Sequence, residues 1–84
     1  MRRPAMEVFV RLPEHGKIIV YKLNEMQRNQ AWLAAQCAST RATINNIILG
    51  KQAPSLNMAF RISIALNMSV EEIFSDLIEK SREE

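Results

Sequence analysis

Apolar residues recur at helical spacing along most of the chain after residue 28, and each run follows a residue suited to capping a helix. Asn29 is a good N-cap, and the stripe after it consists of Leu33, Ala34, Cys37 and Ala38. We therefore predict a helix beginning near residue 30 with this stripe on its buried side. The cysteine takes the place of an aliphatic residue, so we interpret it as a buried structural thiol.

A second helix is predicted to follow almost at once. Ser39 and Thr40 can cap it, its buried side would consist of Ile44 and Ile47, and Gly50 would end it in the left-handed conformation. The segment is rich in β-branched residues, which have low helical propensity. Tertiary packing must therefore stabilise this helix.

Two more helices are predicted toward the C-terminus. Ser55 can cap a helix over about residues 56–66, and Asn67 can end it in the left-handed conformation. The segment Ser69-Val70-Glu71-Glu72 is a capping box that opens a last helix over residues 70–80.

The N-terminal quarter carries a mixed pattern. Residues 6–12 alternate and are rich in β-formers, residues 13–16 indicate a turn, and residues 6–21 could therefore form a hairpin. The competing interpretation, which we favour, is a short strand over residues 6–12 followed by a helix over about residues 18–28. His15, within the turn, is expected to be exposed.

The length and composition indicate one small domain. The chain has 84 residues, of which 48% are hydrophobic and 24% are charged, and a chain of this size buries only about 60% of its unfolded surface. We divide it into an N-terminal extension over residues 1–17, a domain over residues 18–80 and a charged tail over residues 81–84. The fold class is expected to be all-α with five helices, with or without a short N-terminal strand or hairpin.

The same composition excludes several classes of function. One cysteine cannot form an internal disulfide or a CxxC zinc site, so we expect no metal and no cofactor. No apolar run approaches ~18 residues and the N-terminus lacks the apolar stretch of a signal peptide, so we expect a cytoplasmic protein without a membrane partner. No catalytic constellation or glycine-rich phosphate loop is present, so we do not expect an enzyme.

Charge is distributed unevenly along the chain. Residues 1–61 contain nine basic and three acidic residues, whereas residues 62–84 contain two basic and six acidic ones. No acid occurs between residues 26 and 70. Such asymmetry favours a polyanionic partner on one part of the molecule.

Several motifs occur in a fixed order along residues 29–74. They are Asn29-Gln30-Ala31-Trp32-Leu33-Ala34, then Thr40-Arg41-Ala42-Thr43-Ile44, Gly50-Lys51, Pro54-Ser55-Leu56 and Ser69-Val70-Glu71-Glu72-Ile73-Phe74. In this order they resemble the helices and connections of the Cro/repressor-type helix-turn-helix family, also called the XRE family. The sequence departs from the family pattern at Ala38, where the turn usually has glycine, and at Ile48 and Leu49, where polar residues are usual.

The resemblance implies a repressor-like helix-turn-helix domain that binds double-stranded DNA and regulates transcription. Its recognition helix, over about residues 40–49, would lie in the major groove. On a helical wheel, Ile44, Ile47 and Thr43 share one side. Roughly opposite them lie Arg41, Ala42, Asn45 and Leu49.

Arginine, alanine and asparagine suit the reading of base edges. Gln30 and Thr40 lie at helix N-termini, where phosphate binds, and Lys51 can reach the DNA backbone as a point charge. Thr43 would help to position the backbone and Asn46 flanks the reading face. The candidate DNA-binding residues are Gln30, Thr40, Arg41, Ala42, Thr43, Asn45, Asn46 and Lys51.

An alternative function uses the same fold as a protein-interaction module, of the antitoxin or anti-repressor type, with weak or no DNA binding. The sparse charge on the reading face and its apolar end at Ile48 and Leu49 favour this alternative.

Two large apolar residues fall on otherwise polar helical faces. Ile64 and Trp32 point away from the apolar stripes of their helices, which indicates further buried surfaces. The resemblance implies dimers formed near the last two helices, so we predict a weak homodimer through Ile64, Leu77 and Ile78. Either residues 6–12 or a second copy could cover Trp32, and we favour residues 6–12.

Overall fold

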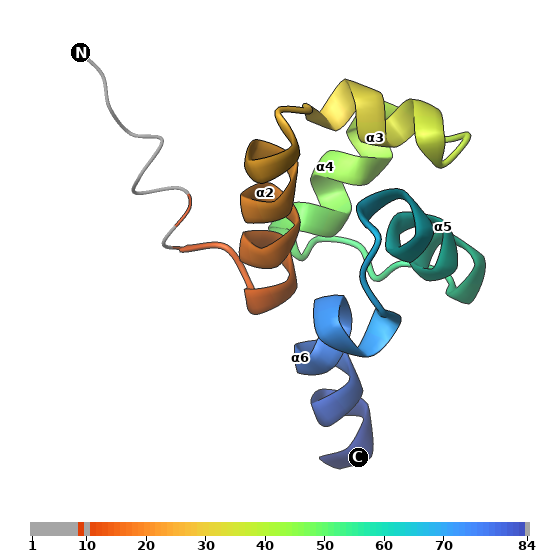
Figure 1. The fold of residues 1–84 in the computed structure, drawn as a ribbon. Coiled ribbons are helices and arrows are strands. Elements are labelled where there is room, and N and C mark those ends of the chain that lie inside the picture. The colour runs from red at the N-terminus through yellow and green to blue at the C-terminus, as the bar shows by residue number, and fades with distance from the viewer. Residues whose placement is uncertain (1–8, 10, 84) are drawn as a thin grey trace.

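The computed structural model describes residue 9 and residues 11–83, and within these residues it contains five helices and no strand. The all-α fold class is confirmed. In Figure 1, α2 and α5 lie on opposite sides, α3 lies above, α4 lies behind and α6 lies below. The helices are α2 (Glu14–Met26), α3 (Gln30–Gln36), α4 (Arg41–Leu49), α5 (Leu56–Leu66) and α6 (Val70–Glu83).

The helices begin at the predicted caps. Three capping side chains accept a hydrogen bond from the backbone N–H three residues on: Asn29 from Trp32 at 2.8 Å, Thr40 from Thr43 at 3.1 Å, and Ser55 from Met58 at 3.1 Å. At the start of α6, Ser69 and Glu72 exchange the two reciprocal bonds of a capping box, at 2.8 and 3.0 Å. These caps are encoded locally, which is why the sequence predicts them.

The left-handed helix ends are also confirmed. Gly50 ends α4 with a φ of 81° and Asn67 ends α5 with a φ of 56°. Both residue types tolerate this conformation better than other residues.

The start of α2 corrects the N-terminal predictions. The helix begins at Glu14, four residues earlier than predicted, so the turn over residues 13–16 and the hairpin over residues 6–21 are wrong. Gly16 is a helical residue, and a Cβ added to it would lie only 2.2 Å from the carbonyl oxygen of Ile48. The glycine therefore permits close packing of α2 on α4 and does not mark a turn.

Most of the predicted strand over residues 6–12 lies outside the described residues. In its described part the strand is wrong, because Phe9 and Arg11 are helical and not extended. The backbone N–H of Leu12 donates to the carbonyl of Phe9 at 3.1 Å, and Leu12 is buried.

Helix α6 runs to Glu83, so residues 81–83, assigned to the tail by the sequence, are helical. It is kinked at Phe74, whose φ of −111° and ψ of 29° are not helical.

All five helices contribute to a single core. Cys37 is buried there, as predicted. Helix α2 packs on α6 and on α4, and α3 packs on α4 and α5. The buried hydrophobic residues are Leu12, Ile19, Leu23, Leu33, Ala34, Cys37, Ile44, Ile47, Ile48, Ala59, Ile62, Leu66, Ile73 and Phe74.

Candidate nucleic-acid interface

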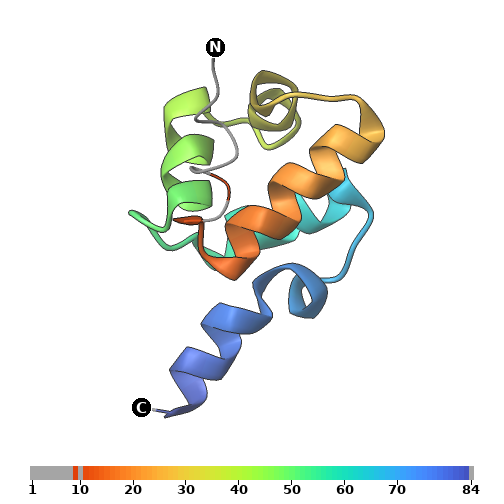
Figure 2. The same ribbon diagram turned by 90° about the vertical axis from the view of Figure 1, so that its left-hand side faces the viewer.

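Helices α3 and α4 form two successive short helices joined by a tight turn, and they pack directly against each other. Figure 2 shows α4 at one edge of the molecule, beside α2 and α3. Ile44 and Ile47 anchor the inner side of α4 in the core. The opposite side of α4 is therefore available to a partner.

This outer side of α4 presents the three residues that the helical wheel selects. Arg41, Ala42 and Asn45 are exposed, and together with Gln30 from α3 they line a shallow hollow. Four of the candidate DNA-binding residues are thus brought together from two helices. We call these four the α4 reading face.

The remaining candidates surround this face. Thr40 caps α4, and its hydroxyl also donates to the hydroxyl of Thr43 at 3.0 Å. Asn46 and Thr43 are half-buried, and Lys51 is exposed directly after the end of α4. A cation at Lys51 would therefore lie beyond the C-terminal end of the helix, away from Arg41 at its start.

Not every basic side chain between residues 26 and 70, the segment without acids, is available to a ligand. The guanidinium of Arg61 donates to the carbonyl oxygen of Cys37 at 2.9 Å and so satisfies the C-terminal end of α3. Within the part of the chain that the structure describes, neither Arg41 nor Lys51 forms an ion pair. Burial raises the pKa of the Cys37 thiol, although the charge of Arg61 opposes the shift.

The turn between α3 and α4 contains Ala38 in the left-handed conformation, with a φ of 51°. This is the position at which the sequence departs from the usual glycine of the resembled family. A residue with a Cβ in this region costs roughly 1–2 kcal/mol. The turn therefore keeps its geometry without the glycine, because the packing of α3, α4 and α5 imposes it.

Comparison with known families decides what this pair of helices is. The helix-turn-helix family model matches residues 21–73, which is more than half of the chain and includes both helices and their turn. The chain belongs to the XRE-type helix-turn-helix family. It is a DNA-binding regulator of that type, and the family is not known as enzymatic.

No significant match was found to a curated protein or to a solved structure. Among the helices described over residues 14–83, none is long and apolar enough to cross a membrane.

One sequence interpretation of the XRE-type domain is wrong. Ile48 does not lie on the α4 reading face, because it is only 2% exposed and packs in the core, where α2 meets α4. Leu49 is half-buried and also packs against the core. A helical wheel places Ile48 within 40° of Ile44, and that signal could have identified it as a core residue. The apolar end that favoured a protein-interaction function is therefore absent at Ile48.

The predicted dimer residues lie in two places. Ile64, on α5, is 79% exposed and lies beside Gln36 of α3. Leu77 and Ile78, on α6, are half-buried and line a groove with Leu56 at the start of α5. The structure thus does not bring Ile64 together with Leu77 and Ile78 within one protomer.

Trp32 has a neighbour that the sequence does not predict. It is half-buried, and the guanidinium carbon of Arg28 lies 5.0 Å from the centre of its ring. This cation–π contact covers part of the ring from within the same connection between α2 and α3. Residues 6–8 and 10, from the segment predicted to cover it, lie outside the described residues.

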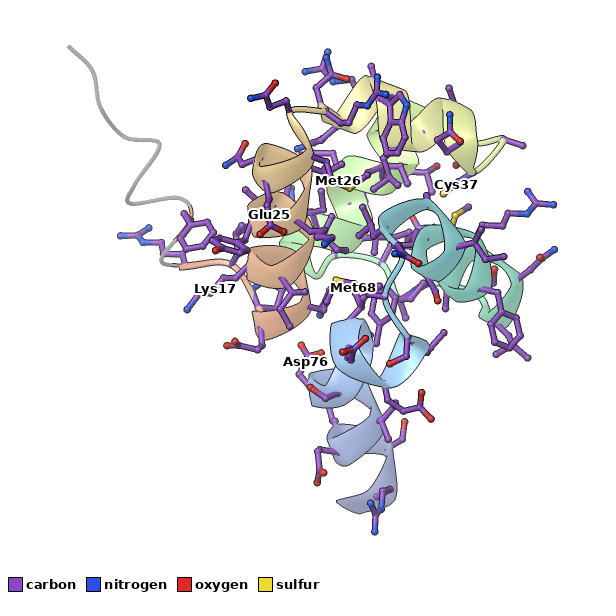
Figure 3. The ribbon with its side chains drawn as sticks, in the orientation of Figure 1. Lys17, Glu25, Met26, Cys37, Met68 and Asp76 are labelled. Atoms are coloured by element: carbon purple, nitrogen blue, oxygen red, sulfur yellow. The ribbon has the colours of Figure 1, made fainter. Side chains whose placement is uncertain are left out.

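The sequence interpretation of His15 is also wrong. Its side chain is buried, because α2 begins earlier than predicted and turns this residue toward α4 and α6. Its ring Nδ1 lies 2.7 Å from a carboxylate oxygen of Asp76, and the same oxygen accepts the backbone N–H of His15 at 3.2 Å. Figure 3 shows Asp76 where α6 approaches the first turn of α2.

These contacts shift the acidity of Asp76. Burial of the carboxyl raises its pKa, but the hydrogen bonds from the side chain and backbone of His15, and the charge of that ring, lower it more. The net pKa of Asp76 lies below its ordinary value, so the carboxylate form is favoured in the folded protein. No local pattern connects His15 to a residue 61 positions away.

Proposed function

We propose that this chain is a phage-repressor-like regulator that recognises a specific sequence in double-stranded DNA with α4 in the major groove. The observation that carries the proposal is the α4 reading face, which places Arg41, Ala42 and Asn45 outward beside Gln30 in a segment without acids. A helix held by a buried inner side and polar on its outer side fits the width of the major groove.

Each residue of this face has a chemical role in the proposal. Arg41 would bridge two acceptors of a guanine, Asn45 would pair with an adenine, and the methyl of Ala42 would contact a thymine methyl. Gln30, Thr40, Thr43 and Lys51 would hold the phosphate backbone, and Asn46 would flank the reading face.

Replacement of Arg41 and of Lys51 by alanine should weaken DNA binding in different ways. Arg41→Ala should cost about 1–3 kcal/mol at the selected site and relax the preference at one base pair, because a bidentate base contact is lost. Lys51→Ala should weaken binding to all DNA sequences alike, because one phosphate contact is lost. It should also reduce the slope of log affinity against log salt concentration by about one. Selection from a random DNA pool followed by titration at several salt concentrations measures both effects.

Lys22→Ala is the matched control, since this half-buried lysine lies on α2 and pairs with Glu25 at 3.3 Å. It removes one cation without touching the reading face and should leave the selected sequence unchanged. DNA affinity that does not depend on salt, or a selected sequence that Arg41→Ala leaves unaltered, would contradict the proposed function.

We also propose that the domain forms a weak two-fold homodimer. The outer side of α5 carries an exposed apolar stripe formed by Leu56 (71% exposed), Phe60 (51%) and Ile64 (79%). Leu77 and Ile78 continue this apolar surface beside Leu56 through the α5–α6 groove. A two-fold pair of recognition helices should then meet half-sites about 10 bp, or ~34 Å, apart.

If the dimer forms, the apparent mass in sedimentation should increase with protein concentration at tens of micromolar. Ile64→Lys should abolish this increase. A lysine there would place a charge in the apolar contact. Asn24→Lys adds the same charge at an exposed position of α2 and should leave the association intact. A monomer at every concentration in the unaltered protein, unchanged by Ile64→Lys, would rule out this interface.

A further inference from the structure

The His15 ring is enclosed between two hydrogen-bond acceptors. It is 2% exposed, its Nδ1 lies 2.7 Å from Asp76 Oδ2, and its Nε2 lies 2.8 Å from the carbonyl oxygen of Ile47. The ring also lies beside Phe74, with ring centres 5.6 Å apart and ring planes tilted by 39°.

The chemistry of the two partners determines which protonation state the His15 ring must have. A peptide carbonyl only accepts, and so does a carboxylate, which is the favoured form of Asp76. A neutral imidazole has one N–H and one lone pair, so it can satisfy only one of the two contacts. Only the imidazolium form donates from both nitrogens at these distances.

One contact of the ring reaches the C-terminal end of α4, and the other reaches α6. Ile47 lies in the last turn of α4, where carbonyls lack helical N–H partners and carry partial negative charge. Its carbonyl accepts from the backbone N–H of Gly50 at 3.1 Å and from the ring of His15. Asp76 follows the kink of α6 at Phe74 and accepts from the first turn of α2. The ring thus joins α2, α4 and α6.

We propose that His15 is a positioning residue, held as an imidazolium, which fixes the C-terminal turn of the DNA-reading helix α4 to α6 and makes this attachment sensitive to pH. The inference rests on the proposed function, because it assigns α4 to the DNA. We call the arrangement of the His15 ring, the Asp76 carboxylate and the Ile47 carbonyl the His15 clamp.

Loss of one proton from the His15 ring breaks its hydrogen bond to the Ile47 carbonyl and keeps the one to Asp76. Asp76 is an ionised acceptor and Ile47 a neutral carbonyl, so the bond to Asp76 remains charge-assisted after the ring becomes neutral, whereas a bond to Ile47 would not. The remaining N–H therefore stays with Asp76, and a lone pair then faces the Ile47 carbonyl. The end of α4 loses its attachment, while α2 and α6 remain joined.

Few other charges face this ring. From α4 it meets a backbone carbonyl, since the one charged side chain of that helix is Arg41 at its opposite end. From α6 it meets Asp76, which alone among the described carboxylates contacts it. The neighbouring charged residues on α2 and α6 that form no hydrogen bond or ion pair with the ring are Glu14, Lys17, Glu72, Glu79 and Lys80.

The direction of the pH dependence follows from the number of bonds. The charged ring makes two bonds and the neutral ring one, so the full contribution of the His15 clamp is present while the ring is charged and falls when the ring loses a proton at higher pH. The lowered pKa of Asp76 acts at the other end: its contribution is present above its ordinary value of 3.8 and is lost as the pH falls below it. Folding stability should therefore fall both when the Asp76 carboxylate takes up a proton and when the His15 ring loses one.

The experiment compares the whole chain at pH 5.5 and pH 8. His15 is the single histidine, so nitrogen NMR of its ring is unambiguous. At pH 5.5 both ring nitrogens should carry a proton. Between pH 5.5 and 8, the unfolding equilibrium constant should rise, and the affinity for the selected DNA should fall, each by about tenfold more than in His15→Gln, since the hydrogen bond from the charged ring to the Ile47 carbonyl is lost.

Two variants of α6 separate the clamp from general charge effects. Asp76→Asn keeps the size and an acceptor oxygen but removes the charge, so it should flatten the pH dependence. Glu79→Gln removes an exposed acid of the same helix and should retain the profile of the unaltered protein. A ring with one N–H at pH 5.5, or parallel pH profiles in the unaltered protein and His15→Gln, would overturn the proposal.

The measurements on free protein also distinguish this proposal from the function on which it rests. Ring NMR and unfolding require no DNA and test the His15 clamp even if His15→Gln does not fold, because the NMR uses the unaltered chain. Absence of DNA binding at both pH values would contradict the proposed function and the DNA-positioning role of the clamp, whatever the ring shows.

Discussion

Replacement of Gly16 by alanine should destabilise the domain by about 3 kcal/mol or more, as measured by denaturant unfolding. Alanine is normally preferred over glycine inside a helix by about 1 kcal/mol. Here the added methyl would lie 2.2 Å from the carbonyl oxygen of Ile48, so α2 and α4 would have to separate. A domain of this size has a total stability of about 4–13 kcal/mol, so this is a large fraction of it.

Lys17→Ala is the control for this prediction, because it lies in the same turn of α2 and is only half-buried. Its unfolding free energy should stay within about 0.5 kcal/mol of the original. If Gly16→Ala proves as stable as the unaltered protein, the close approach of α2 to α4 is not a feature of the folded state.

Ile44→Ala should lower the unfolding free energy by about 2–5 kcal/mol. Ile44 is buried on the inner side of α4, so the truncation removes apolar contacts and leaves a cavity beneath the recognition helix. The α4 reading face is chemically unaltered by this change. We therefore expect reduced stability with the same selected DNA sequence at temperatures where the variant is folded.

The neighbouring substitution Asn45→Ala should have the opposite effect, with unchanged stability and weaker DNA discrimination. Asn45 is exposed, so its truncation should change stability by no more than about 0.5 kcal/mol while reducing DNA discrimination. Unfolding curves and DNA titrations on this adjacent pair separate the inner from the outer side of one helix. Equal losses of stability in the two variants would show that α4 is oriented differently.

The sequence from Asn29 onward predicts the helices well because their determinants are local. Caps such as Thr40 and Ser69 bond to residues three positions away, and Gly50 and Asn67 end helices by their own backbone preferences. The period of the apolar residues then fixes which side of each helix is buried, and so the α4 reading face follows without knowledge of the tertiary structure.

The N-terminal third is less predictable because its determinants are distant in sequence. Gly16 is typical of a turn when read locally, and only the carbonyl of Ile48 gives it another meaning. His15 has its partners 32 and 61 residues away. The capping of α3 by Arg61 is equally non-local, since the arginine lies 24 residues from the Cys37 carbonyl that it contacts.

The position of Trp32 has a practical consequence for all of these measurements. The chain contains one tryptophan, and its indole lies in α3 under the Arg28 guanidinium, two residues from Gln30 of the reading face. Indole emission therefore originates at a single site that belongs both to the folded core and to the border of the proposed interface. Intrinsic fluorescence can follow the packing of this one helix in every variant, without an attached dye.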